Sequence, residues 1–307
     1  MSVRIVSYNI FAPVYADRPE HYFKCQPEFL KTDYRWNLIR DQLEHEIVNH
    51  KNTIICLQEV SLTLIPDLEL FFRRLNYSFF HNLYGQMRND YMGGIAMAIP
   101  ITMRLNSMSI IRIGDRIRSM MKLRSEQTTS LPTDLWEIAA SQPHTFICLQ
   151  LVINDKQLSV GTYHMPCLYK QPDVMLIHSS IIKDLMFELA AGQNFILAGD
   201  FNFKPRDICY KYLIKEEHVD CNLPESAIEQ KLKSAYREKN GSEPVYTDFS
   251  HKCNSERFCE TLDYIFYNGH LTVDNVLQLP DQPTSESYPD QTHPSDHLMI
   301  AATFRLL

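Results

Sequence analysis

The sequence predicts an α/β fold, because short apolar runs typical of buried strands alternate with segments whose apolar residues recur at helical spacing. The chain has 307 residues, of which 45% are hydrophobic, and this supports the core of one large domain or two small ones. No change in composition marks a linker, and no segment repeats at a fixed period. We therefore expect a single domain over residues 1–307.

Strands and helices alternate in the first third of the chain. The apolar patterns predict strands over 3–10, 53–60, 77–81 and 94–99. A helix can begin at Thr32 or Asp33, which are capping residues, and another near Pro66, which suits a first helical turn. Residues 11–30 contain several prolines and are expected to form a loop.

The rest of the chain continues this alternation. Strands are predicted over 107–113, 145–153, 157–164, 195–198, 261–267, 271–279 and 298–307. Helices are predicted from Pro172 to Gly192 and over 205–213 and 224–238. Turns are expected at Asn154-Asp155 and Asn240-Gly241, and a loop over 280–294.

Residues 101–145 are the least regular part and are expected to be a variable insertion. Within it, 116–124 forms a helix or a loop, and 125–144 is expected to lie on the surface. Between Arg104 and Arg124 the segment is rich in arginine and carries one acid, Asp115. This charge indicates either a solvated face or a contact for a polyanion or a membrane surface.

The most informative stretch is Asn194–Asn202, with the sequence NFILAGDFN. An apolar run leads to Gly199, where a backbone can turn or approach another group closely, and then to Asp200 and Asn202. If the chain stays extended, these two side chains face one spot. The carboxylate can polarise water or hold a metal ion, and the carboxamide can donate a hydrogen bond to a phosphate oxygen. The competing interpretation is a simple turn after a strand.

Polar residues that packing does not require stand at the ends of other predicted strands. They are Asn9, Glu59, His164, Asp263 and Asp296-His297. Buried acids are costly unless they are paired or bound to a metal, and packed sheets bring strand ends together. We therefore expect these groups to line one cleft together with Asp200 and Asn202.

An oxygen-rich set of this kind suits Mg²⁺, with Mn²⁺ as a substitute, rather than zinc. Glu59 is the expected metal ligand, and Asp296 and Asn9 are further candidates. Asn9 can also position the waters of the metal ion.

The remaining residues supply what phosphodiester hydrolysis needs. Asp200 is expected to orient or deprotonate the attacking water, and His297 to contact a phosphate oxygen or transfer a proton. Asp263 is expected to fix the orientation of the His297 ring. Asn202 can position the phosphate, and His164 can stabilise charge in the transition state.

Charge and composition argue against other classes of protein. A net charge of −7 is unfavourable for a protein that coats nucleic acid electrostatically, but not for an enzyme that grips a few phosphates through a metal ion. No apolar run approaches the length of a membrane span, and the first strand pattern begins at Val3, so we expect no anchor and no signal or transit peptide. The eight cysteines form no C-x-x-C pair, which indicates a reduced, intracellular and cytoplasmic setting.

The same residues resemble the motifs of a known family. The motifs are SYNI at 7–10, LQEV at 57–60, TYHM at 162–165, GDFN at 199–202, LDYIFY at 262–267 and SDH at 295–297. They stand in the order seen in the endonuclease/exonuclease/phosphatase superfamily, and they span essentially the whole chain. The resemblance implies a DNase I-like four-layer α/β sandwich, with two mixed sheets face to face and helices outside. It also implies a Mg²⁺-dependent phosphodiesterase or phosphatase.

Two stretches are similar to one branch of that superfamily, the Ccr4-type deadenylases, nocturnin and Angel proteins. They are Tyr8–Ile47 and Glu243–Tyr267, the second reading EPVYTDF…TLDYIFY. The resemblance implies an RNA substrate such as a poly(A) 3′ end, or 2′,5′-linked oligoadenylate. Asp248 stands where the branch has a nucleotide-contacting Asn, and Phe258 lies near the place of a base-stacking Phe. No leucine-rich repeat is present, so we expect no docking module of that kind.

The leading interpretation is a Mg²⁺-dependent 3′–5′ exoribonuclease of the deadenylase type that releases 5′-nucleotides. One alternative is a phosphatase or phosphodiesterase acting on a small nucleotide, an inositol phosphate or a lipid head group. A more distant alternative is a non-catalytic binding module. The chain is expected to be a monomer whose partner is RNA or a nucleotide.

Overall fold

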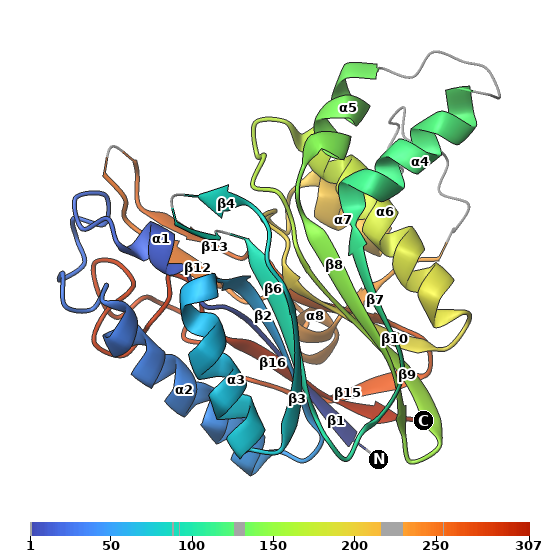
Figure 1. Cartoon of the computed structure of the whole chain (residues 1–307), viewed down its shortest axis with the longest axis horizontal. Helices are drawn as coiled ribbons and strands as arrows, with labels where there is room; N and C mark the ends of the chain where they lie inside the picture. Colours follow the sequence, from blue (N-terminus) through green and yellow to red (C-terminus); the bar gives the residue numbers. More distant parts are fainter. Residues whose placement is uncertain (1, 88, 92, 126–132, 216–229, 254) are drawn as a thin grey trace.

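The computed structural model describes all residues except 1, 88, 92, 126–132, 216–229 and 254. Two six-stranded sheets face each other, and helices cover their outer faces (Figure 1). The first sheet is covered by α2 (Thr32–Asn49) and α3 (Ile65–Arg74), and the second by α6 (Pro172–Ala190). This arrangement confirms the expected four-layer α/β sandwich.

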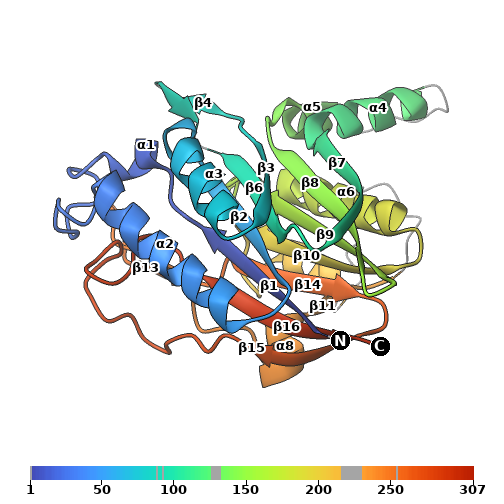
Figure 2. The same cartoon turned by 60° about the horizontal axis from the view of Figure 1, so that its bottom comes forward.

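The first sheet has the strand order β15-β16-β1-β2-β6-β3. Its strands are β1 (Ser2–Asn9), β2 (Thr53–Val60), β3 (Tyr77–Asn82), β6 (Gly94–Pro100), β15 (Leu271–Val276) and β16 (Ile300–Leu306). β1 and β2 are parallel, and the other neighbours are antiparallel. Because β1 pairs with β16, the two ends of the chain lie side by side in Figure 1 and in Figure 2.

The second sheet has the order β11-β14-β10-β9-β8-β7. Its strands are β7 (Arg104–Arg112), β8 (Thr145–Ile153), β9 (Lys156–His164), β10 (Asn194–Asp200), β11 (Lys233–Ser234) and β14 (Asp263–Asn268). β9 and β10 are parallel, and the other neighbours are antiparallel.

Shorter elements complete the described chain. They are α1 (Pro13–Ala16), a 3₁₀ turn (Leu62–Leu64), β4 (Gln86–Met87), β5 (Asp90–Tyr91), α4 (Ile113–Ser125), α5 (Thr133–Ser141), α7 (Ile208–Ile214), α8 (Ala235–Asn240), β12 (Asp248–Ser250) and β13 (Phe258–Glu260). In the described part of the chain, we find no helix with the length and apolar character needed to cross a membrane.

The core lies in three layers of apolar contact. Ile54 of β2 and Ile196 of β10 belong to the cluster between the two sheets. Leu43 of α2 and Phe72 of α3 pack on the outside of the first sheet, and Ile181 of α6 packs on the outside of the second. The burial of both faces explains why the central strands are continuous apolar runs rather than alternating ones.

The two parallel strand pairs determine where polar side chains gather. α2 connects β1 to β2, and α6 connects β9 to β10, so each pair is a β–α–β unit. Strand ends after such units are common ligand sites. Asn9, Glu59, His164 and Asp200 stand at these ends, and the contact between Asn9 and Asp200 shows that both sheets present them at the same end of the sandwich.

Several local predictions differ from the structure. The helix expected over 224–238 is wrong for its described part, because Lys233-Ser234 pairs with the edge of β14 and the helix is confined to Ala235–Asn240. The hydrogen bonds offered by an open strand edge outweigh helical periodicity here. Residues 224–229 lie outside the described residues.

The segment 125–144 is not simply a surface insertion. Residues 126–132 lie outside the described residues, but 133–141 form α5, whose Trp136 and Ala139 are buried in the cluster under α6. The apolar face of α5 therefore extends the helical layer on the second sheet.

Candidate active site

The register of β10 places predicted site residues in one row. Asp200 pairs with His164 of β9 on one side and with Asp263 of β14 on the other. The Nε2 atom of His164 lies 3.4 Å from Oδ2 of Asp200. A Cβ at Gly199 would lie 1.9 Å from the carbonyl oxygen of Tyr163, so the glycine allows β9 and β10 to pack closely. The close strand contact brings His164 beside Asp200.

The imidazole of His297 is hydrogen-bonded to Asp263. The Nδ1 atom of His297 lies 2.8 Å from Oδ2 of Asp263. The hydroxyl of Thr247 donates to the same oxygen at 2.6 Å, and it accepts from the backbone N–H groups of Leu262 and Asp263. The Asp263 carboxylate, which holds the imidazole, is therefore itself fixed to the backbone through the hydroxyl of Thr247.

Asn9 joins two carboxylates. Its Nδ2 atom lies 3.1 Å from Oε1 of Glu59 and 3.0 Å from Oδ2 of Asp200. Its Oδ1 atom accepts from the backbone N–H of Phe11 at 3.0 Å, which leaves the amide hydrogens to face the carboxylates. Asn9 therefore presents its amide hydrogens to the two carboxylates, and its role as a metal ligand stays a prediction.

Glu59 stands in an irregular part of β2. Its backbone has φ 59°, and the register with β6 shifts between Gln58 and Val60. Such a bulge re-aims a side chain, and a left-handed residue other than glycine costs about 1 kcal/mol or more. The Oε2 atom accepts from the N–H of Ala12 at 2.8 Å, and burial raises the pKa of the carboxyl.

The charges of the site are set by burial and by each other. Burial raises the pKa of the carboxyls of Asp200 and Asp263. Burial alone would lower the pKa of His297, but the carboxylates of Asp263, Asp248 and Asp200 hold it well above its ordinary value. Burial lowers the pKa of His164. The site thus combines a cationic imidazole with a neutral one.

Asp248 and Lys252 add two further charged contacts, one to His297 and one to Asp296. The Oδ2 atom of Asp248 lies 3.5 Å from Nε2 of His297. The Nζ atom of Lys252 lies 3.5 Å from Oδ2 of Asp296 and 5.4 Å from the ring centroid of Tyr22. Burial opposes the charge of Lys252, but the carboxylates of Asp296 and Asp248 raise its pKa. Asp296 is thus the partner of a lysine, and its role as a metal ligand stays a prediction.

Sequence reasoning missed Lys252. No periodic pattern marks it, since it lies between β12 and β13 in the segment 249–261. The signal available was the unusual acid at Asp248, because an added buried carboxylate calls for a nearby cation.

Asn202 departs from the expected geometry. The chain does not stay extended after β10, because Asn202 has φ 52°. Its backbone N–H donates to Oδ1 of Asp200 at 2.9 Å, and its Nδ2 donates to the carbonyl of Met165 at 2.8 Å. Asn202 still lies beside Asp200, but it is placed by a turn rather than by strand alternation.

Phe258 lies on the same face of the β12–β13 hairpin as Asp248. Phe258 pairs with Ser250, and Asp248 pairs with Glu260, so these side chains share one face. The Nζ atom of Lys204 lies 5.2 Å from the ring centroid of Phe258 and 3.0 Å from Oε1 of Glu260. The ring is partly exposed, which suits the stacking role predicted for it.

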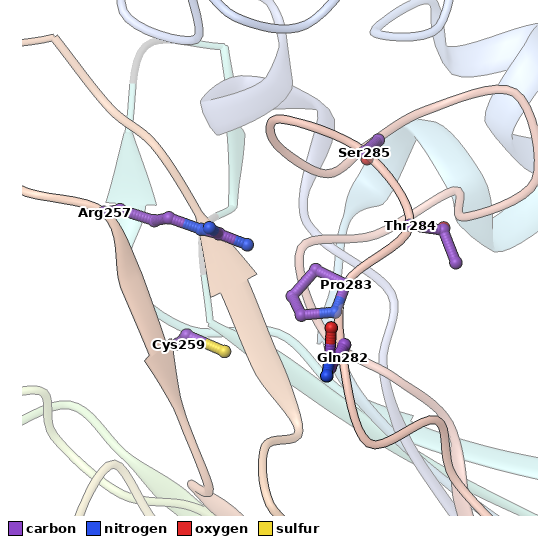
Figure 3. Close-up of a pocket in the computed structure, with 6 residues that line it drawn as sticks. All are labelled: Arg257, Cys259, Gln282, Pro283, Thr284 and Ser285. Carbon is purple, nitrogen blue, oxygen red and sulfur yellow. The ribbon is translucent and has the colours of Figure 1, made fainter.

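The opposite face of the hairpin borders a separate pocket of about 600 Å³ (Figure 3). Its lining residues are Arg257, Cys259, Gln282, Pro283, Thr284 and Ser285. Cys259 pairs with Phe249 and therefore points away from Asp248, and the guanidinium of Arg257 lies 4.7 Å from the ring centroid of Phe249. This hollow is not part of the carboxylate–histidine cluster.

The basic segment forms β7 and α4. Arg116 pairs with Glu188 of α6, and Arg118 pairs with Asp115 and donates to the carbonyl of Ala140 at 2.6 Å. These contacts favour the solvated structural face, and a polyanion or membrane contact stays a prediction.

The donor set fits a hard divalent cation. One ligand atom each from Asp200, Asp263 and His297 lie within 4.8 Å of one another. Asn9 connects the carboxylate of Glu59 to the same group. Because the His297 ring is cationic here, the available ligands are the carboxylate oxygens, which are typical of magnesium or manganese rather than zinc.

Two mixed sheets with an Asp–His–Asn site at the ends of their parallel strands define the DNase I-like class of α/β sandwich. The chain belongs to the Endonuclease/Exonuclease/phosphatase family, whose sequence profile matches residues 6–297. The resemblance found in the motifs is therefore confirmed.

Individual proteins are similar over the whole chain. The mouse (Mus musculus) 2′,5′-phosphodiesterase 12 is 29% identical over 344 residues, which cover 99% of this chain and 52% of the relative. The chain thus spans about half the length of that relative. The structure of ANGEL2, a 2′,3′-cyclic phosphatase, in complex with adenosine-2′,3′-vanadate matches with a TM-score of 0.75 and 19% identity, covering 100% of this chain and 96% of the other. The human Nocturnin catalytic domain matches with a TM-score of 0.70 and 21% identity, covering 100% and 95%. At these identities the structures support the fold.

Replacing Asp248 by asparagine tests the charge balance of the site. Burial raises the pKa of this carboxyl to about 7. The carboxyl of the unfolded chain ionises near its ordinary pKa, which is lower. Between these two pKa values the folded state binds more protons than the unfolded state, so its stability falls as the pH rises toward 7. We expect the metal-free Asp248→Asn variant to melt above the wild type at about pH 8 and close to it at about pH 4. Thermal denaturation with EDTA measures this, and a lower melting temperature at the higher pH would contradict it.

Proposed function

We propose that this chain is a Mg²⁺-dependent phosphodiesterase and acts as a 3′–5′ exoribonuclease of the deadenylase type, releasing 5′-nucleotides. The observation that carries the proposal is the continuous set of contacts from Asp263 through His297, Asp200 and Asn9 to Glu59. A binding module has no need of this set, because each buried acid in it costs stability.

The residues supply distinct parts of the reaction. Asp200 orients the attacking water or accepts a proton from it. Its raised pKa makes it a better base than an ordinary carboxylate. The cationic ring of His297 binds a phosphoryl oxygen, and Asp263 keeps that ring in place. His164 donates a second hydrogen bond to the phosphoryl group. Asn202 holds the loop beside Asp200 in position.

We propose that the divalent ion is Mg²⁺, with Mn²⁺ as a substitute. Glu59 holds this ion, and the carboxylate of Asp200 contributes to its binding. When bound, it acts as a Lewis acid on the phosphoryl group. The excess of buried carboxyls around His297 supports the need for such a cation.

A second candidate is hydrolysis of a small nucleotide substrate such as 2′,5′-oligoadenylate. It is favoured by the likeness to a 2′,5′-phosphodiesterase over 99% of the chain. An inositol phosphate or lipid head group is less well supported, because Arg116 and Arg118 are engaged in local ion pairs.

Cleavage of labelled substrates tests the proposal. The full chain is incubated with Mg²⁺ and 5′-labelled RNA ending in poly(A), mixed-sequence RNA or 2′,5′-oligoadenylate, beside the Asp200→Asn variant. We expect a ladder that shortens from the 3′ end, is fastest on poly(A) and disappears in the variant. Faster cleavage of 2′,5′-oligoadenylate would select the second candidate. Absence of cleavage of all three by folded, metal-loaded protein would overturn both.

Further features of the proposal concern the chain as a whole. We propose that residues 1–307 act as one catalytic domain and a monomer, with 101–145 as a variable insertion. We also propose an intracellular, cytoplasmic setting, supported by the free state of the cysteines that the structure describes. The substrate class is RNA or a nucleotide, and Phe258 and Asp248 are its proposed contacts.

A further inference from the structure

Buried polar atoms without a protein partner gather behind His164. Within the described residues, they include Nδ1 of His164, Nδ1 of His144 and the hydroxyl of Tyr84. The rings are neighbours, because the ring centroid of His144 lies 6.1 Å from that of His164 and 5.1 Å from that of Tyr84. Native proteins rarely leave such atoms unpaired. Their occurrence in three adjacent rings therefore indicates a shared partner.

The adjacent His178 shows what a purely structural histidine looks like here. Its Nε2 atom lies 3.0 Å from the carbonyl of Ala139, and its Nδ1 lies 2.7 Å from the hydroxyl of Tyr163. The Nε2–H donates to the carbonyl, so Nδ1 accepts from the Tyr163 hydroxyl. The ring centroid of His178 lies 6.5 Å from that of His144, but both nitrogens of His178 already have partners without His144.

The two supporting rings are held in place by the backbone. A Cβ at Gly93 would come within 2.3 Å of the Tyr84 ring, and the Gly93 N–H donates to the Tyr84 carbonyl at 3.3 Å. The His144 carbonyl accepts from the N–H of Ile113, the first residue of α4, at 3.0 Å. Neither ring is a loosely placed surface group.

The protonation states leave one consistent pattern of donors. The Nε2 atom of His164 faces Oδ2 of Asp200 at 3.4 Å. A carboxylate only accepts, so the hydrogen of the neutral His164 ring is on Nε2, and its Nδ1 must accept. Burial raises the pKa of Tyr84 well above 10, so its hydroxyl remains a donor. Burial keeps the pKa of His144 well below its ordinary value, so its ring is neutral.

We propose that Tyr84 and His144 are positioning residues that, through one shared buried water, hold His164 in its Nε2–H tautomer. The Tyr84 hydroxyl donates to the water, and the two hydrogens of the water bond to Nδ1 of His144 and Nδ1 of His164. Every unpaired atom in the group gains a partner in this arrangement. The consequence for catalysis rests on the proposed function: Nε2–H is then a fixed donor on the Asp200 side of the ring, where the phosphoryl group is proposed to bind. Support of this kind behind a functional histidine commonly changes activity when it is removed.

The ¹⁵N NMR spectrum of histidine-labelled full-length protein tests the tautomer directly. The His164 signals are assigned by their loss in His164→Gln. In the wild type we expect the shifts of a protonated Nε2 and an unprotonated, hydrogen-bonded Nδ1. In Tyr84→Phe, which removes a single oxygen, we expect the His164 shifts to move toward a mixture of tautomers. Unchanged His164 shifts in Tyr84→Phe, or an Nδ1–H tautomer in the wild type, would overturn the proposal.

Variants of the second ring separate positioning from packing. His144→Phe keeps the ring volume and should shift the His164 signals, whereas His144→Gln keeps a hydrogen-bonding group and should restore them in part. His178→Gln is the matched control, because it removes an adjacent buried histidine that is already satisfied. We expect it to lower the melting temperature without moving the His164 signals. Equal shifts in His178→Gln and His144→Phe would show that packing alone is responsible.

Kinetics add a readout that keeps the two proposals apart. On whichever substrate the wild type cleaves, Tyr84→Phe should lower kcat roughly tenfold with little change in KM. If the wild type cleaves none of the substrates, the proposed function fails while the NMR result still decides the tautomer. An unchanged kcat together with shifted His164 signals would overturn the link between the tautomer and catalysis.

Discussion

Replacing Asp200 by asparagine is expected to lower the rate of phosphodiester cleavage about 10³-fold without unfolding the protein. Asp200 accepts from Asn9 and from the backbone of Asn202, and it lies 3.4 Å from His164. An amide fills the same space and can accept some of these bonds, but it cannot take a proton from water. The measurement is kcat at saturating Mg²⁺, on the substrate that the wild type cleaves.

The same variant has an opposite effect on stability. Burial raises the pKa of the Asp200 carboxyl, so the unfolded carboxyl gives up its proton at a lower pH than the folded one. At pH values above the ordinary pKa of an aspartate, the folded state therefore binds more protons than the unfolded state. In this range the wild type loses stability as the pH rises. Without metal at neutral pH, Asp200→Asn should melt at or above the wild-type temperature.

A surface acid provides the control for this substitution. Asp274 pairs with Arg305 on the edge of the first sheet, away from the cluster, so Asp274→Asn should leave both rate and melting temperature nearly unchanged. Activity of folded, metal-loaded Asp200→Asn within about tenfold of the wild type would show that Asp200 is not the base.

The site residues that could be predicted from the sequence are mostly those at strand ends. Asp200, His164 and Glu59 each end a largely apolar run, and such runs indicate strands that are buried on both faces. Their pairings could not be predicted in the same way. The N–H of Phe11 binds the Asn9 oxygen and leaves its amide hydrogens between two carboxylates, and no short sequence pattern indicates these partners.

Local patterns fail where distant backbone competes with them. Strand alternation predicted that Asp200 and Asn202 face one spot, but a left-handed turn places Asn202 instead. Helical spacing predicted a long helix before Asn240, but the edge of β14 pairs with Lys233-Ser234. The strand partner of Lys233-Ser234 is remote in sequence, as is the Met165 carbonyl that binds the Asn202 side chain, and a short window contains no record of either.

Arg35 shows a different limit. Arginine is almost never fully buried unless it is paired, yet Arg35 is 1% exposed. It donates to the carbonyls of Ile10 at 3.0 Å, Phe11 at 2.8 Å and Pro294 at 2.9 Å. These carbonyls belong to the loops that follow β1 and precede β16, so Arg35 holds together the backbone on which Asn9 and His297 stand. Only the folded chain shows that this acceptor set exists.

Replacing Glu59 by glutamine is expected to remove most of the stabilisation that Mg²⁺ gives to the protein, and to lower activity at least about 10²-fold. The Glu59 carboxylate accepts from Asn9 on one oxygen and from the N–H of Ala12 on the other. A glutamine presents one NH₂ to these donors, so it loses a hydrogen bond as well as the charge that attracts the ion. The measurement is the melting temperature as Mg²⁺ is added, which needs no substrate.

Two outcomes of that titration point to different sites. If the Mg²⁺-dependent rise in melting temperature is lost in Glu59→Gln and kept in Asn202→Ala, the ion is held on the first sheet by Glu59. If folded Glu59→Gln keeps both the rise and near-normal activity, the ligands are instead the carboxylates of Asp200 and Asp263, which lie in one group with His297. Because Asn9 joins Glu59 to Asp200, an ion held on either side changes the charge felt on the other. The Mg²⁺-dependent change in melting temperature therefore has to be compared between the Glu59→Gln and Asn202→Ala variants. This comparison decides which sheet supplies the metal ligand.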